Sequence, residues 1–398
     1  MGKSASIYFF SGDFADVVKR HAAGEEQIYA THGEVAKLCH DILSAGVALT
    51  IYSFITAEAR EDRPLEGLRV ISLGGRNYND SGLLREAVRN DHADGIVAHF
   101  AALELLQAVK AKDGRAMAVL ANSYNRKGPK AALERWRVVR LLNSSRFELV
   151  SNHCLPATAH LARIGVDRRK LIPWDVPHRF NPADQVPKKL ECKPAYQVAY
   201  AGTIRADKGV ADLIRAASEL KQKGIELQCL FAGVGEVEEM EALGNQLGIA
   251  DQLSFRGLVP NSQVFEMFRR ADLVAVPSHA EYPEGFPLTM FEAIASRTPI
   301  VCSNHPMLAP IMKNDTTAVI FRSGDPMALA TAIARVLNDA DLYAHLSTNA
   351  DSSWDALRGP ADWRTMLTEW IVRGRESTWI GSHMLDAVAR QRPASLAA

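Results

Sequence analysis

The sequence predicts an α/β protein with two doubly wound domains, and three observations favour this fold class. Short apolar runs alternate with amphipathic stretches along nearly all of the 398 residues, which is typical of βαβ units and parallel sheets. A single hydrophobic core stops growing at about 250–300 residues, so this chain length favours two domains. A segment rich in proline, lysine and polar residues, 180–194, separates the halves and is typical of an interdomain linker.

From these observations we expect four segments along the chain. Residues 1–180 form an N-terminal domain, 181–194 the linker, 195–345 a second domain and 346–398 a group of C-terminal helices. The sequence leaves open whether these helices pack back on the first domain.

In the first half, short apolar runs predict buried strands. The apolar run at the N-terminus is too short for a signal peptide, so we predict a first strand there. Ile28–Ala45 has the spacing of an amphipathic helix, and Gly46 is a typical residue to end it. The predicted strands are Ser6–Phe10, Ala48–Phe54, Arg69–Leu73, Gly95–His99, Met117–Ala121 and Leu149–Ser151.

The second half repeats this alternation of strands and helices. The predicted strands are Tyr196–Ala201, Leu227–Ala232, Leu253–Phe255, Leu273–Val276, Ile300–Cys302 and Ala318–Phe321. The helices predicted between them are Val210–Lys223, Val237–Leu247, Ser262–Arg269 and Met327–Asn338. Doubly wound sheets bind ligands at the carboxyl ends of their strands, so polar and glycine residues at those ends are the candidate site residues.

Composition narrows the function classes. The formal net charge is zero, so no global field attracts nucleic acid, and we expect no nucleic-acid partner. No stretch approaches the ~18 apolar residues of a membrane-spanning helix. The five cysteines are scattered and lack the spacing of metal ligands, which favours a reducing, cytoplasmic location without a bound metal.

Two carboxylates, Glu284 and Glu292, stand on either side of a predicted helix start. Pro287 suits the first helical position, and the N–H groups of Leu288 and Thr289 then lie at the positive end of the helix, where an anion binds. Carboxylates accept hydrogen bonds strongly from hydroxyl groups. An anion with polyhydroxyl groups on both sides describes a nucleotide-sugar. The alternative, that these glutamates only favour the helix dipole, stays open from this segment alone.

Three strand ends in the second half add candidate ligands. Gly202–Gly209 contains Arg205 and Lys208, whose cations suit a diphosphate. Gly233 lies in a tight turn after the next strand, and the backbone around Val259 follows the third. Each of these loops alone is equally consistent with an ordinary turn.

Taken together, these segments resemble the donor site of retaining glycosyltransferases of family 4. The resemblance lies in Glu284–Leu288 and Glu292–Ala295, which follow Val276–Ser278. Gly202–Gly209 resembles the phosphate loop of that family. Two further landmarks match in order: Arg256–Gly257 and Ala271–Asp272.

The resemblance is strong over residues 196–340 and fainter but collinear over the first 180. It implies the GT-B fold, in which two Rossmann-like domains face one another across a cleft. It also implies transfer of a sugar from a nucleoside-diphosphate sugar to an acceptor hydroxyl, with retention at the anomeric carbon. Such enzymes usually work without a divalent metal, so no cofactor is expected.

The resemblance assigns roles to single residues. Glu292 would hold the ribose hydroxyls, and Glu284 those of the donor sugar. Arg205 and Lys208 would neutralise the diphosphate. Glu284, Arg205, Lys208 and His99 are our candidate catalytic residues. The remaining donor-site candidates are Gly202, Thr203, Phe286, Pro287, Leu288, Thr289, Gly233 and Val259.

Two positions depart from the family pattern. Thr203 stands where many members have arginine, so Arg205 must supply that cation. Pro287 replaces the second glycine of the family's Gly-Phe-Gly, which removes one N–H but keeps the helix start.

In the first domain, His99 ends a predicted strand where the family places a histidine that lines the cleft. Such a histidine suits a hydrogen bond to a sugar hydroxyl or a phosphate. A second histidine of the family is replaced by Asn122–Ser123, and Gly24 is matched to the glycine turn before the first helix.

Residues 129–142 mix arginines with Trp136 and aliphatic residues, as a basic amphipathic helix does. Such a helix can lie on an anionic membrane. It is therefore a candidate for peripheral contact at the inner face of the membrane, which would suit a lipid-linked acceptor. A half-buried helix with solvated charges is the alternative.

The leading hypothesis is thus a glycosyltransferase of polysaccharide, glycolipid or glycoconjugate biosynthesis, with a nucleotide-sugar donor and a glycan or lipid-linked acceptor. Two alternatives stay open: a sugar-nucleotide epimerase of the same fold, and a non-catalytic partner subunit that binds nucleotide-sugars. The sequence does not indicate the base, the sugar or the acceptor.

Overall fold

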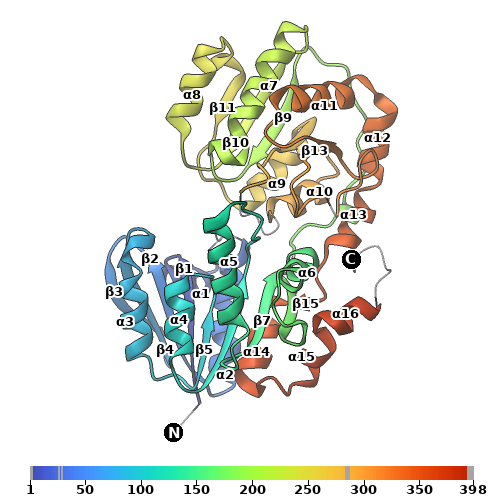
Figure 1. Ribbon diagram of the computed structural model, residues 1–398. Coiled ribbons are helices and arrows are strands. Elements are labelled where there is room, and N and C mark those ends of the chain that lie inside the picture. Colours follow the sequence, from blue (N-terminus) through green and yellow to red (C-terminus); the bar gives the residue numbers. More distant parts are fainter. Residues whose placement is uncertain (1–2, 26, 28–29, 283–286, 310, 392–398) are drawn as a thin grey trace. The chain divides into compact units, whose positions relative to one another are not determined.

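The computed structural model describes residues 3–25, 27, 30–282, 287–309 and 311–391. The chain divides into two compact units (Figure 1). The first unit comprises the described residues up to Pro177 and those from Gly359 onward, and the second unit is His178–Arg358. The chain therefore enters the first unit twice.

The described part of the first unit forms a nine-stranded sheet in the order β15-β8-β7-β6-β5-β1-β2-β4-β3. The strand β3, at one edge, is antiparallel to β4, and the other pairs are parallel. The strands are β1 (Ser4–Ser11), β2 (Ala48–Ile55), β3 (Ala59–Leu65), β4 (Leu68–Gly75), β5 (Gly95–Ala98), β6 (Arg115–Leu120), β7 (Phe147–His153), β8 (Leu171–Asp175) and β15 (Ala361–Asp362).

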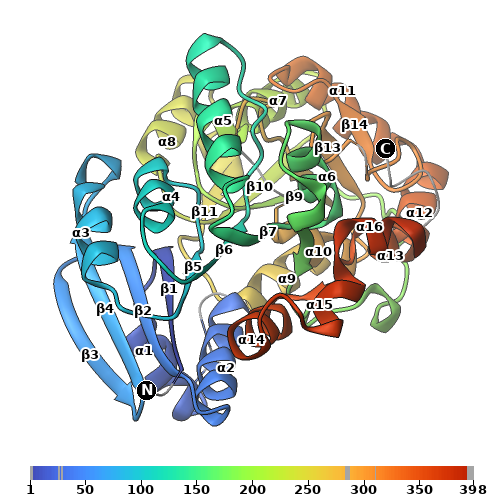
Figure 2. The ribbon, with the colours of Figure 1, turned by 60° about the horizontal axis from the view of Figure 1, so that its bottom comes forward.

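Helices cover both faces of this sheet, because its central strands are apolar on both sides (Figure 2). One face packs against α1 (Phe14–Ala22), α2 (Ala30–Ser44), α14 (Trp363–Arg373) and α15 (Thr378–His383). The other face packs against α3 (Gly82–Asn90), α4 (Leu103–Lys110), α5 (Pro129–Leu142), α6 (Leu155–Arg163) and α16 (Leu385–Gln391).

The C-terminal segment is part of the first unit's core through Trp370, which is fully buried. The indole N–H of Trp370 donates to Glu148 Oε2 over 2.9 Å. The guanidinium of Arg115 lies 5.2 Å from the centre of the Trp370 ring and donates to the carbonyl oxygen of Trp370. Aromatic burial and a cation–π contact therefore join residues far apart in the sequence.

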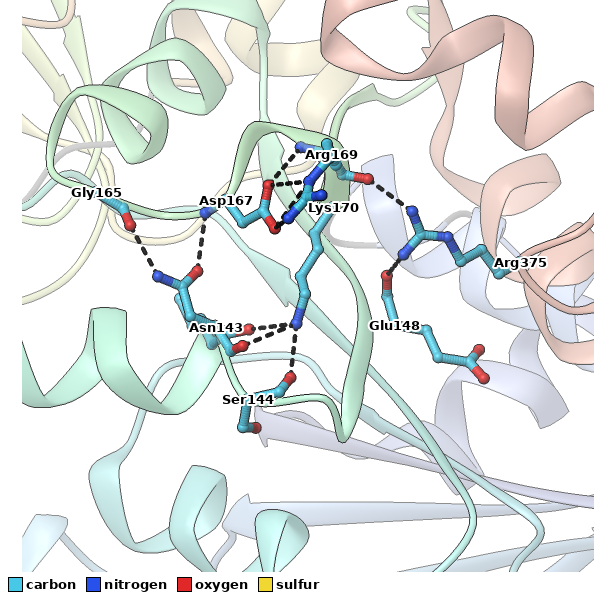
Figure 3. Close-up of polar contacts among 9 residues, drawn as sticks. Asn143, Ser144, Glu148, Gly165, Asp167, Arg169, Lys170 and Arg375 are labelled. Carbon is cyan, nitrogen blue, oxygen red and sulfur yellow. Dashed lines mark hydrogen bonds and ion pairs between the residues drawn. The ribbon is translucent and has the colours of Figure 1, made fainter.

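Polar contacts join the C-terminal end of α5 to the turn before β8, and they join that turn to the C-terminal segment (Figure 3). The Lys170 ammonium, in the short 3₁₀ turn Arg168–Lys170, donates to the carbonyl oxygens of Asn143 and Ser144 over 3.1 and 2.6 Å. It thus satisfies carbonyl groups that the end of a helix leaves open. Arg375 bridges the carbonyl oxygens of Glu148 and Arg169, each over 2.9 Å.

The described part of the second unit forms a six-stranded parallel sheet in the order β11-β10-β9-β12-β13-β14. This is the strand order of a Rossmann-like fold, with its switch point between β9 and β12. The strands are β9 (Tyr196–Ala201), β10 (Leu227–Ala232), β11 (Leu253–Phe255), β12 (Leu273–Val276), β13 (Ile300–Ser303) and β14 (Val319–Phe321).

The helices of the second unit also lie on both faces of its sheet (Figure 1). One side holds α7 (Val210–Gln222), α8 (Val237–Gln246), α11 (Pro326–Asn338) and α12 (Ala340–Thr348). The other side holds α9 (Asn261–Arg270) and α10 (Thr289–Ala295), with α13 (Ala350–Leu357) packed against α10.

The α/β prediction with two doubly wound sheets is confirmed, and each predicted strand overlaps an observed one. Among the strands of the described residues, β3, β8 and β15 were not predicted. No helix in the described part of the chain is both long enough and apolar enough to cross a membrane.

Candidate functional site

In the second unit, the loops at the carboxyl ends of β9, β10 and β11 are joined by backbone hydrogen bonds. The N–H of Gly202 donates to Ala232, and the N–H of Gly233 donates to Gly257, over 2.9 and 2.8 Å. A Cβ added to Gly233 would lie 1.9 Å from the carbonyl oxygen of Gly202. Only glycine allows this approach. The two predicted site glycines, Gly202 and Gly233, are therefore in direct backbone contact.

The predicted cations lie on the loop that follows Gly202. Arg205 is half exposed and makes a two-point ion pair with Asp207, with N–O distances of 2.9 and 2.8 Å. The Lys208 ammonium lies 4.2 Å from the centre of the Tyr282 ring, a cation–π contact. A diphosphate would therefore have to compete with Asp207 for the Arg205 guanidinium.

The segment after β12 holds the loop Gly202–Gly209 in place. A Cβ on Gly209, whose φ is +75°, would lie 2.1 Å from the carbonyl oxygen of Pro277. The backbone N–H of His279 donates to the carbonyl oxygen of Asp207 over 3.0 Å. The imidazole Nε2 of His279 lies 2.7 Å from Asp212 on the first turn of α7. The sequence prediction did not include His279 or Asp212.

The helix that follows begins later than predicted. Pro287 was expected at the first helical position, but α10 starts at Thr289 with Leu288 as its N-terminal cap residue. The prediction was two residues early because the carbonyl groups of Pro287 and Leu288 accept tight i+3 bonds from Met290 and Phe291, which precede the α-helical turns. Leu288 and Thr289 still lie at the start of the helix.

Glu292, on α10, is the distinctive group of this edge, since only 9% of its surface is exposed. Its Oε1 accepts a 2.6 Å hydrogen bond from the amide of Asn261, at the start of α9. Its Oε2 is buried and has no hydrogen-bond partner among the described residues. Burial raises the pKa of Glu292, and the Asn261 hydrogen bond and the charge of His178 oppose this shift. Val259 lies two residues before Asn261, in the loop after β11.

Two predicted site residues, Glu284 and Phe286, lie outside the residues that the structure describes. The described members of the predicted donor set, from Gly202 to Glu292, share the carboxyl edge of the second unit's sheet. His99 belongs to the first unit.

In the first unit, His99 follows β5 and is half buried. Its Nε2 accepts a 2.9 Å hydrogen bond from the indole N–H of Trp363, on α14. Its ring also contacts the rings of Phe9 and Trp174, with centroids 4.6 and 6.2 Å away. Burial lowers the pKa of His99 to about 4. The imidazole is therefore neutral near pH 7 and carries its proton on Nδ1, which remains a hydrogen-bond donor.

One expectation for the first unit was wrong. Gly24 was matched to the glycine turn before the first helix, but it follows α1. Gly12, with a φ of +137°, occupies the turn between β1 and α1. The helix α1 was not predicted, so the assignment moved to the next glycine along the chain.

The described residues contain no cluster of three or more His, Cys, Asp or Glu side chains placed to hold a metal ion.

Comparison with known proteins identifies the unit that carries this site. Residues 183–353 match the family model "Glycosyl transferases group 1". These residues are a group 1 glycosyltransferase domain. The matched region lies within the second unit and includes every described candidate from Gly202 to Glu292.

The glycosyltransferase domain also has curated relatives. The chain is 30% identical to the D-inositol 3-phosphate glycosyltransferase of Nocardia farcinica over 183 residues, which cover 43% of this chain and 40% of that enzyme. The chain spans only about half, or less, of the length of the first curated relatives that it matches.

Solved glycosyltransferases match nearly the whole chain in fold. Sucrose-phosphate synthase from Thermosynechococcus elongatus aligns over 92% of this chain and 96% of its own, with a TM-score of 0.67 and 18% identity. HepE from Anabaena, solved with UDP-glucose, aligns over 92% of this chain and 98% of its own, with a TM-score of 0.62 and 15% identity. The chain therefore has the GT-B fold of two Rossmann-like domains.

Proposed function

We propose that this protein is a retaining glycosyltransferase that moves a sugar from a nucleoside-diphosphate sugar to an acceptor hydroxyl. The observation that carries the proposal is the carboxylate of Glu292, which has one oxygen held by Asn261 and one buried oxygen with no partner among the described residues. A buried carboxylate oxygen without a partner is costly unless a ligand hydroxyl completes it. In a group 1 glycosyltransferase domain, the ribose of the donor supplies such hydroxyls.

In this proposal the remaining donor residues act on the diphosphate. Arg205 and Lys208 stabilise the charge that develops on the leaving diphosphate as the glycosidic bond breaks. The N–H groups at the start of α10 bind the same phosphates. Glu284 and Phe286 complete the donor sugar's surroundings, as the family resemblance implies.

His99 acts in the first unit as a neutral hydrogen-bond donor. Because its Nε2 accepts from Trp363, the proton of the neutral ring is on Nδ1, which is the nitrogen left to donate to a ligand hydroxyl or phosphate. This arrangement suits positioning of a substrate oxygen and does not suit proton abstraction by Nε2.

The first experiment measures nucleotide affinity by titration calorimetry. UDP is the first nucleotide to test, because HepE was solved with UDP-glucose; GDP and ADP follow. A hydrogen bond to a charged group contributes about 1.5–3 kcal/mol, so we expect Glu292→Ala to weaken the nucleotide that binds by about 10- to 100-fold and to abolish transfer.

The matched control is Glu241→Ala, since Glu241 is an exposed glutamate on α8 of the same unit. It should bind as tightly as the unmodified protein. Unchanged affinity in Glu292→Ala would refute the donor-site assignment. Conversion of the donor alone into an epimer would refute transferase activity.

We also propose that α5 contacts an anionic membrane. The side chains of Leu133 and Trp136 are 48% and 55% exposed, whereas Val138 and Leu142 are buried in the first unit's core. The exposed Arg137 follows Trp136 directly, and the guanidinium of the exposed Arg140 lies 5.4 Å from the centre of the Trp136 ring. Exposed apolar side chains among cations are typical of helices that lie on anionic lipid surfaces.

Flotation with vesicles tests this contact. Binding to phosphatidylglycerol vesicles should exceed binding to phosphatidylcholine vesicles, and Leu133→Ala with Trp136→Ala should abolish it. The exposed Met327, on α11 of the second unit, provides the control variant Met327→Ala, which should float as the unmodified protein does. Equal recovery with both lipids would contradict the proposal.

A further inference from the structure

Aromatic side chains form a row along the carboxyl edge of the first unit's sheet. The five adjacent parallel strands β6, β5, β1, β2 and β4 each end beside one of them, and all five residues lie on or beside the face covered by α3, α4 and α5. In that order they are Tyr124, Phe100, Phe10, Phe54 and Tyr78.

The middle of this row is a packed aromatic base. The ring centroid of Phe10 lies 5.5 Å from that of Phe100 and 6.3 Å from that of Phe54. Phe54 and Phe100 stack with an interplanar angle of 7°. Phe54 and Phe100 are buried, so they fix the position of Phe10.

Above this base, two aromatic faces are open to solvent. Phe10 is 36% exposed and Tyr78 is 61% exposed, and their ring centroids are 5.3 Å apart. An exposed pair of contacting aromatic rings on a sheet's ligand-binding edge is a common feature of binding sites.

Unpartnered polar atoms lie in the loop at the β6 end of the row. Ser123 Oγ, the Tyr124 hydroxyl and Asn125 Nδ2 are buried and have no hydrogen-bond partner among the described residues. Ser123 is only 3% exposed. Tyr124 packs against the same hydrophobic cluster that contains Phe54 and Phe100. Native proteins rarely leave such groups unsatisfied, which points to a ligand.

We propose that this edge binds a pyranose ring of the acceptor, with Phe10 and Tyr78 as the stacking surface and Ser123, Tyr124 and Asn125 as hydrogen-bonding partners. The proposal rests on the proposed function, since it names the chemical class of the acceptor. The C–H face of a pyranose packs on aromatic rings, and its hydroxyls both donate and accept. The unpartnered hydroxyls and amide are neutral groups that match them.

Saturation-transfer-difference NMR on the full chain tests this assignment. The probes are the methyl pyranosides of glucose, galactose, mannose and N-acetylglucosamine, with glycerol 3-phosphate as the charged alternative. We expect saturation of the ring protons of at least one pyranoside. Tyr78→Ala should reduce this signal at least fivefold, and Tyr78→Phe should keep it, because the ring face remains.

Ser123→Ala tests whether this side chain contributes to pyranoside binding without contributing to the stability of the fold. This change removes a buried hydroxyl that has no partner among the described residues, so the melting temperature should not fall. The pyranoside signal should weaken at least threefold. Met327→Ala should change neither quantity.

Three results would overturn the inference. The first is that no pyranoside shows a saturation-transfer signal, and the second is that the signal is unchanged in Tyr78→Ala and Ser123→Ala. The third is a saturation-transfer signal from glycerol 3-phosphate alone. Nucleotide calorimetry on the same samples distinguishes the two proposals. If nucleotides bind and pyranosides do not, the acceptor inference alone fails. If no nucleotide binds, the donor assignment fails whatever the pyranosides do.

Discussion

His99 shows how a single contact sets the chemistry of a side chain. The indole N–H of Trp363 occupies the Nε2 lone pair of His99, so the proton of the neutral ring is confined to Nδ1. Trp363 lies 264 residues further along the chain. It is therefore a positioning residue for His99.

Trp363→Phe should remove the hydrogen bond that favours the Nδ1–H tautomer of His99, while keeping most of the aromatic packing. We expect the population with a proton on Nε2 to rise, because that nitrogen no longer accepts a hydrogen bond from an indole. Long-range ¹⁵N–¹H correlation spectra of His99 measure the tautomer directly. An unchanged Nδ1–H tautomer would show that Trp363 only fills space.

The raised pKa of Glu292 predicts a pH dependence of nucleotide binding. Ribose hydroxyls donate to the ionised carboxylate, so affinity should increase as the pH rises from the ordinary glutamate value of 4.5 through the raised pKa. Calorimetry across this range, compared with Glu292→Gln, measures the effect. A parallel pH profile in the variant would assign the dependence to another group.

The raised pKa of Glu292 makes the folding stability of the nucleotide-free protein change with pH in the opposite direction to nucleotide affinity. A carboxyl group with a raised folded-state pKa stabilises the fold below the unfolded value, and this contribution is lost as the pH rises through the folded value. Glu292→Gln should therefore be more stable than the unmodified protein at neutral pH, and the difference should vanish well below pH 4.5. Urea unfolding at the two pH values measures this.

Single site residues were predictable only where local sequence carries the signal. Glu292 stands out because a glutamate interrupts an apolar helix. Its partner Asn261 is 31 residues away, and nothing local distinguishes this asparagine from a surface one. The Trp363–His99 contact depends on long-range packing for the same reason.

At the scale of elements, glycine determines how closely the donor loops pack. Gly209→Ala should destabilise the second unit, because φ is +75° and the new Cβ would lie 2.1 Å from the carbonyl oxygen of Pro277. Gly224 has a similar φ, +79°, with nothing within 4 Å, so Gly224→Ala isolates the backbone cost of about 1 kcal/mol.

The expected loss of unfolding free energy is about 1–3 kcal/mol greater for Gly209→Ala than for Gly224→Ala, since this is the usual cost of overpacking. Urea denaturation of both variants measures it. Equal losses would mean that the loop Gly202–Gly209 moves freely away from Pro277.

The strands of the second unit were predictable because they are uninterrupted apolar runs between loops with glycine and polar residues. The strand β8 was missed because Pro173 interrupts it, and proline usually argues against a central strand. Pro173 is tolerated because β15 pairs only with Trp174 and Asp175. The edge strand β3 was missed because its sequence is mostly charged.

At the scale of the whole molecule, the two units have separate hydrophobic cores. A change in the first core should therefore leave donor binding by the second unit intact. Trp370→Ala removes a fully buried indole, which costs about 3–5 kcal/mol.

Hydrogen–deuterium exchange should show faster exchange in the first unit of this variant, while calorimetry with the nucleotide that the unmodified protein binds should give an unchanged affinity. The exposed Trp136 supplies the comparison, since Trp136→Ala should alter neither measurement. Loss of nucleotide affinity in Trp370→Ala would show that the units do not behave independently.

The double entry of the chain into the first unit has a practical consequence. The backbone N–H of Gly359 donates to Asp175 Oδ2 over 2.8 Å, so the points where the chain leaves and re-enters that unit are neighbours. Residues 178–358 are thus an insertion between two adjacent ends. A short peptide linker from Pro177 to Gly359 would join the two parts of the first unit into one continuous chain. Residues 178–358 could likewise be exchanged as a cassette for the equivalent residues of a related enzyme.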